Sequence, residues 1–92
     1  IAMLTSFDEF DDVIARANSL PQGLAAYVFT NSLKRAHMTA DALKTGIVCV
    51  NTLQAATTEM PFGGVKHSGF GREGGSHSIQ DYLDTKFINI VM

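Results

Sequence analysis

Apolar residues follow two different spacings along the first half of the chain. Residues 2–7 form a short apolar run that ends at an acidic stretch, and this pattern predicts a strand. The apolar residues that follow recur at i, i+3, i+4 and i+7, which predicts an amphipathic helix from an N-cap at Asp8 to about residue 19. The inward face of this helix comprises Phe10, Val13, Ile14 and Ala17.

The same alternation of element types continues to residue 51. Proline and glycine at 21–23 predict a turn, and the nearly continuous apolar run 24–30 predicts a strand buried on both faces. Asn31 or Ser32 then caps a second helix, and Gly46 is placed where a helix commonly ends in a left-handed residue. The inward face of the second helix comprises Leu33, Ala36, Ala40 and Leu43, and the β-branched run 47–51 predicts a third strand.

This order of elements predicts an α/β fold with a β-α-β-α-β parallel sheet and right-handed crossovers. Ligands of such sheets lie beyond the carboxyl ends of the strands, so residues 52–68, which leave the third strand, are the candidate site. A short helix near 76–83 and a terminal apolar strand at 86–91 complete the chain. Because a glycine-rich stretch separates this last strand from the sheet, we expect it to pair with another subunit or another part of a parent protein.

Composition excludes several classes of function. The net charge of −2 and the pI near 5.8 give no electrostatic reason to bind nucleic acid or an anionic membrane. The uncharged run 46–58 is too short and too polar to span a bilayer. A single cysteine, Cys49, excludes an internal disulfide and fits a reducing compartment, so we expect a cytoplasmic protein.

Glycine is concentrated in one segment, 61–75, which holds six of the eight glycines of the chain. Such a backbone is expected where the chain turns sharply or approaches a neighbour closely. Residues 69–74 match G-x-G-x-x-G, but no strand precedes them, the following helix is short, and the chain ends too early for a dinucleotide-binding unit. A phosphate-binding P-loop pattern is absent as well.

The remaining candidates for chemistry have plain structural interpretations. Cys49 alternates within an apolar strand, which favours a small buried hydrophobe over a nucleophile. Glu59 is interpreted as a solvated loop charge, whereas Glu73 is either a solvated charge or a carboxylate used in proton transfer. Phe62 is either the wall of a pocket or a plug beneath the loop. The three histidines have no zinc-site spacing: His37, His67 and His77.

Three motifs in a fixed order resemble those of the aldehyde dehydrogenase superfamily. They are Gly-Leu-Ala-Ala with Val-Phe-Thr at 23–30, Gly-Ile-Val-Cys-Val-Asn at 46–51, and Pro-Phe-Gly-Gly-Val-Lys-His-Ser-Gly-Phe-Gly-Arg-Glu-Gly-Gly at 61–75. The closing Tyr-Leu-Asp-Thr-Lys-Phe at 82–87 is also typical. The resemblance covers essentially the whole chain, and the wording of 59–75 is most similar to the succinate-semialdehyde dehydrogenase branch.

The resemblance implies the C-terminal segment of a much longer NAD- or NADP-dependent enzyme. Residues 1–72 would be the C-terminal part of its catalytic domain, and residues 73–92 the connecting helix and oligomerisation-arm strand. The catalytic cysteine, the general base and the coenzyme site would lie in the rest of the parent chain, so the 92 residues alone are expected to be inactive and to bind no coenzyme or metal. The parent would form a homo-oligomer, a dimer or tetramer, through the terminal strand. The alternative is a non-catalytic structural or oligomerisation remnant.

The resemblance also assigns roles to individual residues. Phe62 matches an aromatic that lines the substrate tunnel, and Glu73 matches a carboxylate behind the general base that supports proton relay. The variable loop that sets substrate preference corresponds to Leu53, Gln54 and Ala56. The semialdehyde branch often has a serine near Ala56. The positions matched to subunit and domain contacts are Arg72 and Asp84.

Overall fold

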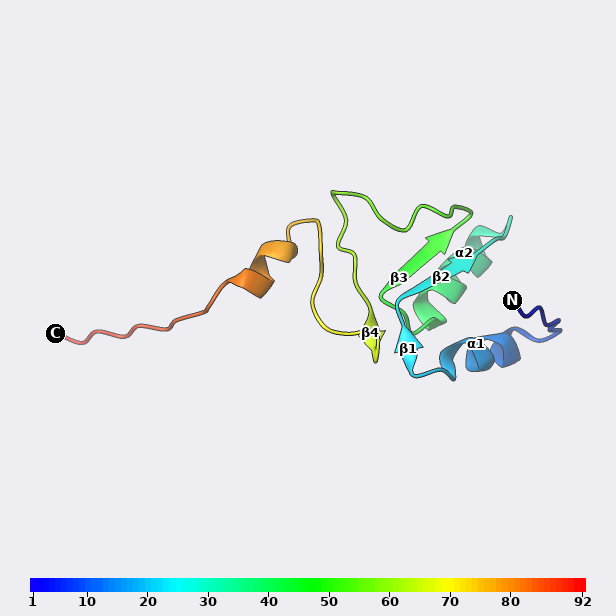
Figure 1. Ribbon diagram of the computed structural model, residues 1–92, viewed down its shortest axis with the longest axis horizontal. Coiled ribbons are helices and arrows are strands. Elements are labelled where there is room, and N and C mark those ends of the chain that lie inside the picture. The colour runs from blue at the N-terminus through cyan, green and yellow to red at the C-terminus, as the bar shows by residue number, and fades with distance from the viewer.

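The computed structural model describes residues 1–92 as an elongated chain of two α-helices, one 3₁₀-helix and two small sheets (Figure 1). Its radius of gyration is 17.8 Å. A compact domain of this length would have a radius of gyration of about 12 Å. The difference arises because the C-terminal residues extend away from the sheets (Figure 1).

Helix α1 spans Phe10–Asn18 and helix α2 spans Leu33–Ala42, so both predicted helices are present. The N-cap of α1 is Glu9 rather than the predicted Asp8, and it makes no side-chain capping bond. In α2 the Oγ of Ser32 accepts a hydrogen bond from the backbone N–H of Arg35 at 3.3 Å, which selects Ser32 over Asn31 as the cap.

A parallel strand pair forms the centre of the segment. Strand β2, Ala25–Val28, pairs with strand β3, Ile47–Val50, in a register that runs from Ala25↔Ile47 to Val28↔Val50. Helix α2 connects the two strands, so the second half of the predicted β-α-β-α-β unit is confirmed. Both strands lie where the apolar runs 24–30 and 47–51 predicted them.

The first strand of that unit is wrong, because residues 2–7 form no strand and are exposed. These residues belong to neither sheet of the chain, and an unpaired strand leaves its backbone groups unsatisfied. In place of the predicted turn at 21–23, strand β1, Gln22–Gly23, pairs antiparallel with strand β4, Val65–Lys66. The observed architecture is therefore a β-α-β unit beside a short antiparallel pair.

Gly46 does not end helix α2. The helix stops at Ala42 with Leu43 as its C-cap, and Gly46 is absent from the positions with positive φ. A Cβ at this position would lie 1.9 Å from the carbonyl oxygen of Gly63. Glycine is required here because the backbone of the 61–75 loop passes directly against the start of β3.

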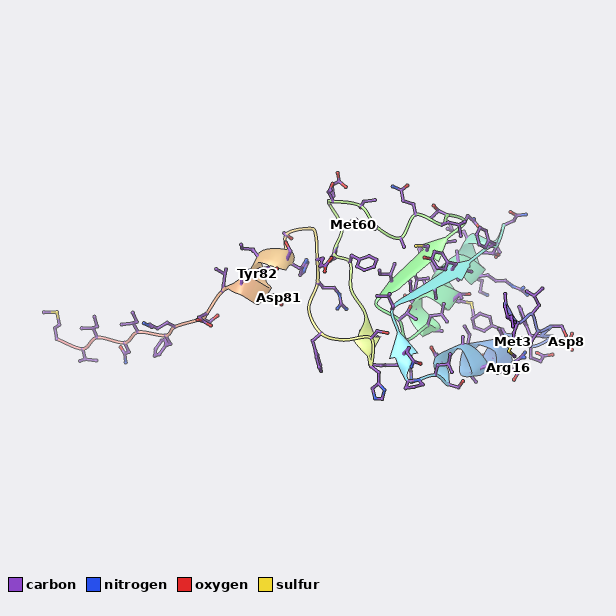
Figure 2. All side chains as sticks on the ribbon, viewed as in Figure 1. Met3, Asp8, Arg16, Met60, Asp81 and Tyr82 are labelled. Carbon is purple, nitrogen blue, oxygen red and sulfur yellow. The ribbon has the colours of Figure 1, made fainter.

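The last part of the chain is a 3₁₀-helix followed by an extended segment. Helix η1 covers Ser78–Tyr82, within the predicted helical range 76–83. Residues 83–92 are exposed and pair with no strand of this chain, and Figure 2 shows their side chains standing clear of the rest. Their pairing with another chain therefore stays a prediction.

The segment buries very little of its own surface. Three of the 92 residues are buried, and Cys49, 6% exposed, is the only apolar side chain among them. The accessible surface is 7916 Å². A folded monomer of this mass would expose about 5,200 Å². Large apolar side chains that a domain normally covers are exposed, among them Leu4, Phe29, Leu33, Phe87 and Ile90.

Polar contacts join the elements where a core is missing. The side chain of Asn18 donates to the carbonyl oxygen of Ala42 at 2.9 Å and accepts from the N–H of Lys44 at 2.8 Å, which ties the C-terminal ends of α1 and α2 together. The ammonium of Lys66 donates to the carbonyl oxygens of Asn18 at 3.2 Å and Leu20 at 3.1 Å. Strand β4 is thereby attached to the free carbonyls at the end of α1. None of the helices is long and apolar enough to cross a membrane.

Because so little apolar surface is buried, we expect the isolated 92-residue chain to unfold without cooperativity. The circular dichroism signal of its helices should fall gradually with urea, and the chain should bind a hydrophobic dye in the absence of denaturant. A sharp sigmoidal transition, with a slope of about 1 kcal/mol/M or more, would contradict this expectation.

Candidate functional site

The carboxyl ends of β2 and β3 are held together by one amide side chain. The Oδ1 of Asn51 accepts from the N–H of Thr30 at 2.9 Å, and its Nδ2 donates to the carbonyl oxygen of the same residue at 2.9 Å. Asn51 has a φ of 56°, a conformation that asparagine tolerates better than most residues. This clamp defines the point at which the candidate site loop leaves the sheet.

A second clamp holds the glycine-rich segment against itself. Phe62 and Glu73 form an isolated antiparallel bridge in which each N–H donates to the carbonyl oxygen of the other residue, at 2.6 and 2.7 Å. Phe62 and Glu73 are eleven positions apart in the sequence, and the bridge places them side by side. The backbone of Phe62 is fixed by this bridge rather than by burial of its ring.

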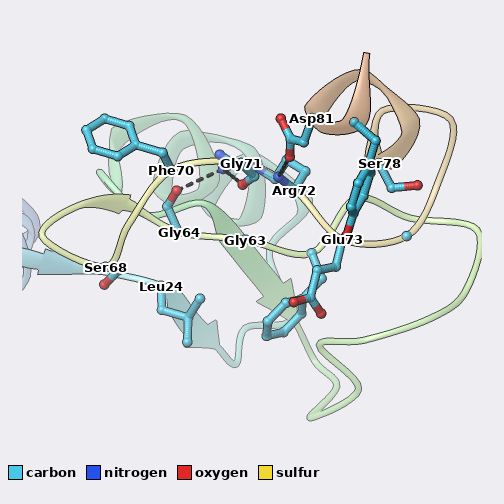
Figure 3. A pocket seen from close by; sticks show the side chains of 13 residues that line it. Leu24, Gly63, Gly64, Ser68, Phe70, Gly71, Arg72, Glu73, Ser78 and Asp81 are labelled. Atoms are coloured by element: carbon cyan, nitrogen blue, oxygen red, sulfur yellow. Dashed lines mark hydrogen bonds between the residues drawn. The ribbon is translucent and has the colours of Figure 1, made fainter. Parts of the chain in front are cut away.

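Arg72 reaches across the same loop. Its Nη1 donates to the carbonyl oxygens of Gly64 at 2.8 Å and Gly71 at 2.7 Å, and its backbone N–H donates to Oδ2 of Asp81 at 3.0 Å (Figure 3). Asp81 belongs to η1, so these contacts connect the loop to the C-terminal helix. The resemblance had matched Arg72 to subunit and domain contacts, a role that stays a prediction.

Two adjoining pockets open on this loop. The larger has a volume of about 540 Å³ and the second has a volume of about 490 Å³. The second pocket is lined by Ala56, Thr57, Thr58, Phe62, Glu73 and Gly74. Phe62 and Glu73 line both pockets, and the ring of Phe62 is half-buried rather than enclosed. The polar and aromatic side chains of the larger pocket come from the loop and η1: Phe62, Ser68, Phe70, Arg72, Glu73, Ser78, Asp81 and Tyr82.

The structure brings together three of the predicted site residues and leaves two apart. Phe62, Ala56 and Glu73 lie on the 490 Å³ pocket. Leu53, with 73% of its surface exposed, and Gln54 line neither pocket. The carbonyl oxygen of Gln54 instead accepts from the thiol of Cys49 at 3.6 Å. The roles of all five residues in binding or proton relay stay predictions.

The two loop carboxylates differ in what surrounds them. Hydrogen bonds from its own backbone N–H and from the hydroxyl of Thr58 lower the pKa of Glu59, and its side chain is exposed. Glu59 is therefore ionised at neutral pH, as expected of a solvated loop charge. Glu73 is also exposed, while its backbone forms the bridge to Phe62. Among the 92 residues, no group of three or more His, Cys, Asp or Glu side chains is placed to hold a metal ion.

Sequence reasoning missed the residues that position the loop. The side chains of Asn18, Asn51 and Lys66 make hydrogen bonds between segments that lie 21 or more positions apart. Asn51 and Lys66 carry the only positive φ values outside glycine. The one usable signal in the sequence was Asn51, directly after a buried strand. Asparagine is enriched at positive φ, so this position could have been predicted to adopt such an angle.

Comparisons with known proteins agree with this arrangement. The aldehyde dehydrogenase family model matches residues 1–88. A probable NADP⁺-type succinate-semialdehyde dehydrogenase of Sinorhizobium fredii is 47% identical over 88 residues, and succinate-semialdehyde dehydrogenase 1 of Schizosaccharomyces pombe is 44% identical over 90. These matches cover 96% and 98% of this chain but 18% of each relative.

Solved structures give the same result. The aldehyde dehydrogenase of Brucella melitensis biovar abortus 2308 matches with a TM-score of 0.85 and 48% identity, over 89% of this chain and 17% of that protein. The NAD⁺ complex of the Bacillus cereus enzyme matches with a TM-score of 0.82 and 44% identity, over 85% of this chain and 16% of that one. The chain belongs to the aldehyde dehydrogenase family, and it spans less than a fifth of the length of these relatives.

We expect the Asn51 clamp to stabilise the site in any longer protein that carries this segment. Asn51→Ala removes two hydrogen bonds and places alanine in a left-handed conformation, which should destabilise the protein by about 2 kcal/mol. Asn51→Gly removes the same bonds without the backbone strain and should be milder. Thermal unfolding measures both effects.

Asn31→Ala is the matched control, because Asn31 is exposed and its side chain makes no hydrogen bond in the structure. A midpoint for Asn51→Ala equal to that of Asn31→Ala would show that the clamp contributes nothing.

Proposed function

We propose that this chain is the C-terminal segment of an NAD- or NADP-dependent aldehyde dehydrogenase, which oxidises an aldehyde to a carboxylic acid. The observation that carries the proposal is identity of 41–48% with enzymes of this family along nearly the whole chain. The parent would use a cysteine thiol outside this segment to form a thiohemiacetal, and a nicotinamide coenzyme bound elsewhere in the parent would supply the hydride acceptor. Hydrolysis of the resulting thioester would release the acid.

In this proposal the segment supplies part of the substrate tunnel. The support is that Phe62 presents a half-buried ring to an open pocket and that Ala56 lies on the same pocket. Leu53 and Gln54 are exposed, so the surface that they would share with substrate must be completed by the rest of the parent. Glu73 would support proton relay from the edge of the same pocket.

The first substrate to test is succinate semialdehyde. Relatives that share 44–47% identity include four succinate-semialdehyde dehydrogenases, and a further relative at 46% acts on aspartate semialdehyde by its name. Alanine at position 56 removes the serine hydroxyl that the semialdehyde branch often has near this point. If succinate semialdehyde proves a poor substrate, alanine at position 56 favours a parent enzyme that prefers a less polar aldehyde.

The second contribution of the segment is subunit association. Residues 86–92 are extended and exposed, and all but Lys86 and Asn89 are apolar, which suits addition of a strand to the sheet of a second copy. The same exposed surface also favours the alternative function, a non-catalytic oligomerisation module. The coding sequence of the parent distinguishes the two functions. A dehydrogenase requires a motif with a nucleophilic cysteine in the residues that precede this segment, whereas an oligomerisation module does not.

The purified 92-residue chain should produce no NADH or NADPH from succinate semialdehyde, while the full-length parent should do so. The reason is that Cys49, the only thiol, is buried within β3. Absorbance of the reduced coenzyme is the measurement, and Cys49→Ala is the control. Aldehyde-dependent turnover by the segment that Cys49→Ala abolishes would contradict the assignment.

Removal of residues 86–92 from the full-length parent should lower its oligomeric state. Analytical ultracentrifugation of the truncated and intact proteins measures the change. Replacement of the exposed Lys34 by alanine, far from this segment on α2, controls for a general effect of mutation. An unchanged number of subunits per particle after truncation would show that other surfaces hold the subunits together.

A further inference from the structure

Three contacts of Arg72 form a continuous connection from helix η1 to the loop that carries Phe62. The carboxylate of Asp81, on η1, accepts the backbone N–H of Arg72 at 3.0 Å. The guanidinium of Arg72 then donates through one nitrogen, Nη1, to Gly64 at 2.8 Å and Gly71 at 2.7 Å. Gly64 lies two positions after Phe62, and Glu73, next to Arg72, forms the bridge to Phe62 itself. Figure 3 shows Arg72 between Asp81 and Gly64.

The packing around these contacts leaves no room for a side chain at Gly63 or Gly71. A Cβ on Gly63 would lie 2.7 Å from Cδ of Arg72 and 2.6 Å from the carbonyl oxygen of Gly71. A Cβ on Gly71 would lie 2.6 Å from Oδ2 of Asp81. The two glycines thus allow the arginine stem and the aspartate to touch the backbone directly. Gly64 is one of only three buried residues, so Arg72 binds a carbonyl in one of the few covered parts of the segment.

We propose that Arg72 is a positioning residue for Phe62, and that Asp81 orients Arg72 for this task. The proposal rests on the proposed function, in which Phe62 lines the substrate tunnel. Arg72 touches no substrate in this scheme. It holds the turn 62–64 against 71–73, and so fixes where the ring of Phe62 enters the pocket.

The chemistry of the donor explains why an arginine suits this position. A guanidinium keeps its charge at all relevant pH values and donates to two carbonyl oxygens without needing a carboxylate partner. Hydrogen bonds from a charged donor are shorter and stronger than neutral ones. Removal of the side chain therefore frees the carbonyl of Gly64, two residues after Phe62, while the backbone bridge from Phe62 to Glu73 remains.

The test uses the full-length enzyme and two straight-chain aldehydes, one short and one long. Arg72→Ala should change the ratio of their KM values by about tenfold, as expected for loss of one charge-assisted contact, while kcat for the short aldehyde changes by less than about threefold. Arg72→Lys retains a cationic donor and should recover most of the ratio. Arg16→Ala is the matched control, because Arg16 is an exposed arginine paired only with Asp12 at 2.8 Å and the carbonyl of Ser6 at 3.2 Å.

A double-mutant cycle separates positioning from general support of the fold. If Arg72 acts through Phe62, Arg72→Ala should have no further effect on the KM ratio in a Phe62→Ala background. Asp81→Ala should move the ratio in the same direction as Arg72→Ala, whereas Asp81→Asn, which keeps an acceptor oxygen, should leave it near the original value. If Arg72→Ala does not fold, Asp81→Ala replaces it in the cycle with Phe62→Ala, and Asp81→Asn serves as its control.

The outcomes distinguish the positioning role of Arg72 from the substrate-tunnel role of Phe62, on which it rests. An unchanged KM ratio in Phe62→Ala overturns the tunnel role of Phe62 and, with it, the positioning role. A changed ratio in Phe62→Ala with no change in Arg72→Ala or Asp81→Ala overturns the positioning role alone. Additive effects of Phe62→Ala and Arg72→Ala also overturn it, because they show that the arginine acts elsewhere.

Discussion

Hydrogen bonds that reach between distant parts of the chain hold this segment in shape, because its own apolar burial is too small to do so. The chain has 32 backbone–backbone hydrogen bonds, whereas a folded domain of 92 residues would have about 60. Half of those present lie outside the helices and strands. The side chains of Asn18, Asn51, Lys66 and Arg72 supply the connections that a core would otherwise make. Such contacts fix direction and register, but they contribute little net stability one by one.

The glycine-rich loop follows from the same constraint. A Cβ on Gly46 would collide with the carbonyl group of Gly63, and a Cβ on Gly74 would lie 2.8 Å from the carbonyl oxygen of Met60. Without an apolar core to keep them in place, the strands and the loop are brought together through direct backbone approach. The loop glycines with positive φ, at 69, 71, 74 and 75, also let the chain reverse direction. Close approach and reversal account for the glycines without any phosphate ligand.

The sequence predicted the elements whose signals are local and failed where a partner segment decides the outcome. Helical spacing identified α1 and α2, and the apolar runs identified β2 and β3, because each pattern lies within a few residues. Residues 2–7 carry a strand-like pattern, yet a strand requires a paired neighbour, and neither small sheet of this chain includes these residues. Gly46 was assigned to a helix end because its contact with Gly63 is 17 positions away and invisible to a local pattern. The loop leaves β3 where the order of elements predicted it, and its role as a site stays a prediction. The Phe62–Glu73 bridge could not be predicted, because it depends on pairing between separate parts of the loop.

Long-range contacts of this kind also relate the exposed terminus to the pocket. Helix η1 leads directly into residues 83–92, and Asp81 on that helix holds the backbone of Arg72. If the terminal residues pair with a second copy, the position of η1 is set by the assembly, since nothing else in this chain covers its exposed face. The geometry of the Phe62 turn then depends on subunit association through two side chains, Asp81 and Arg72. Under the proposed function, this connection would make the aldehyde preference of the parent depend on how its subunits associate.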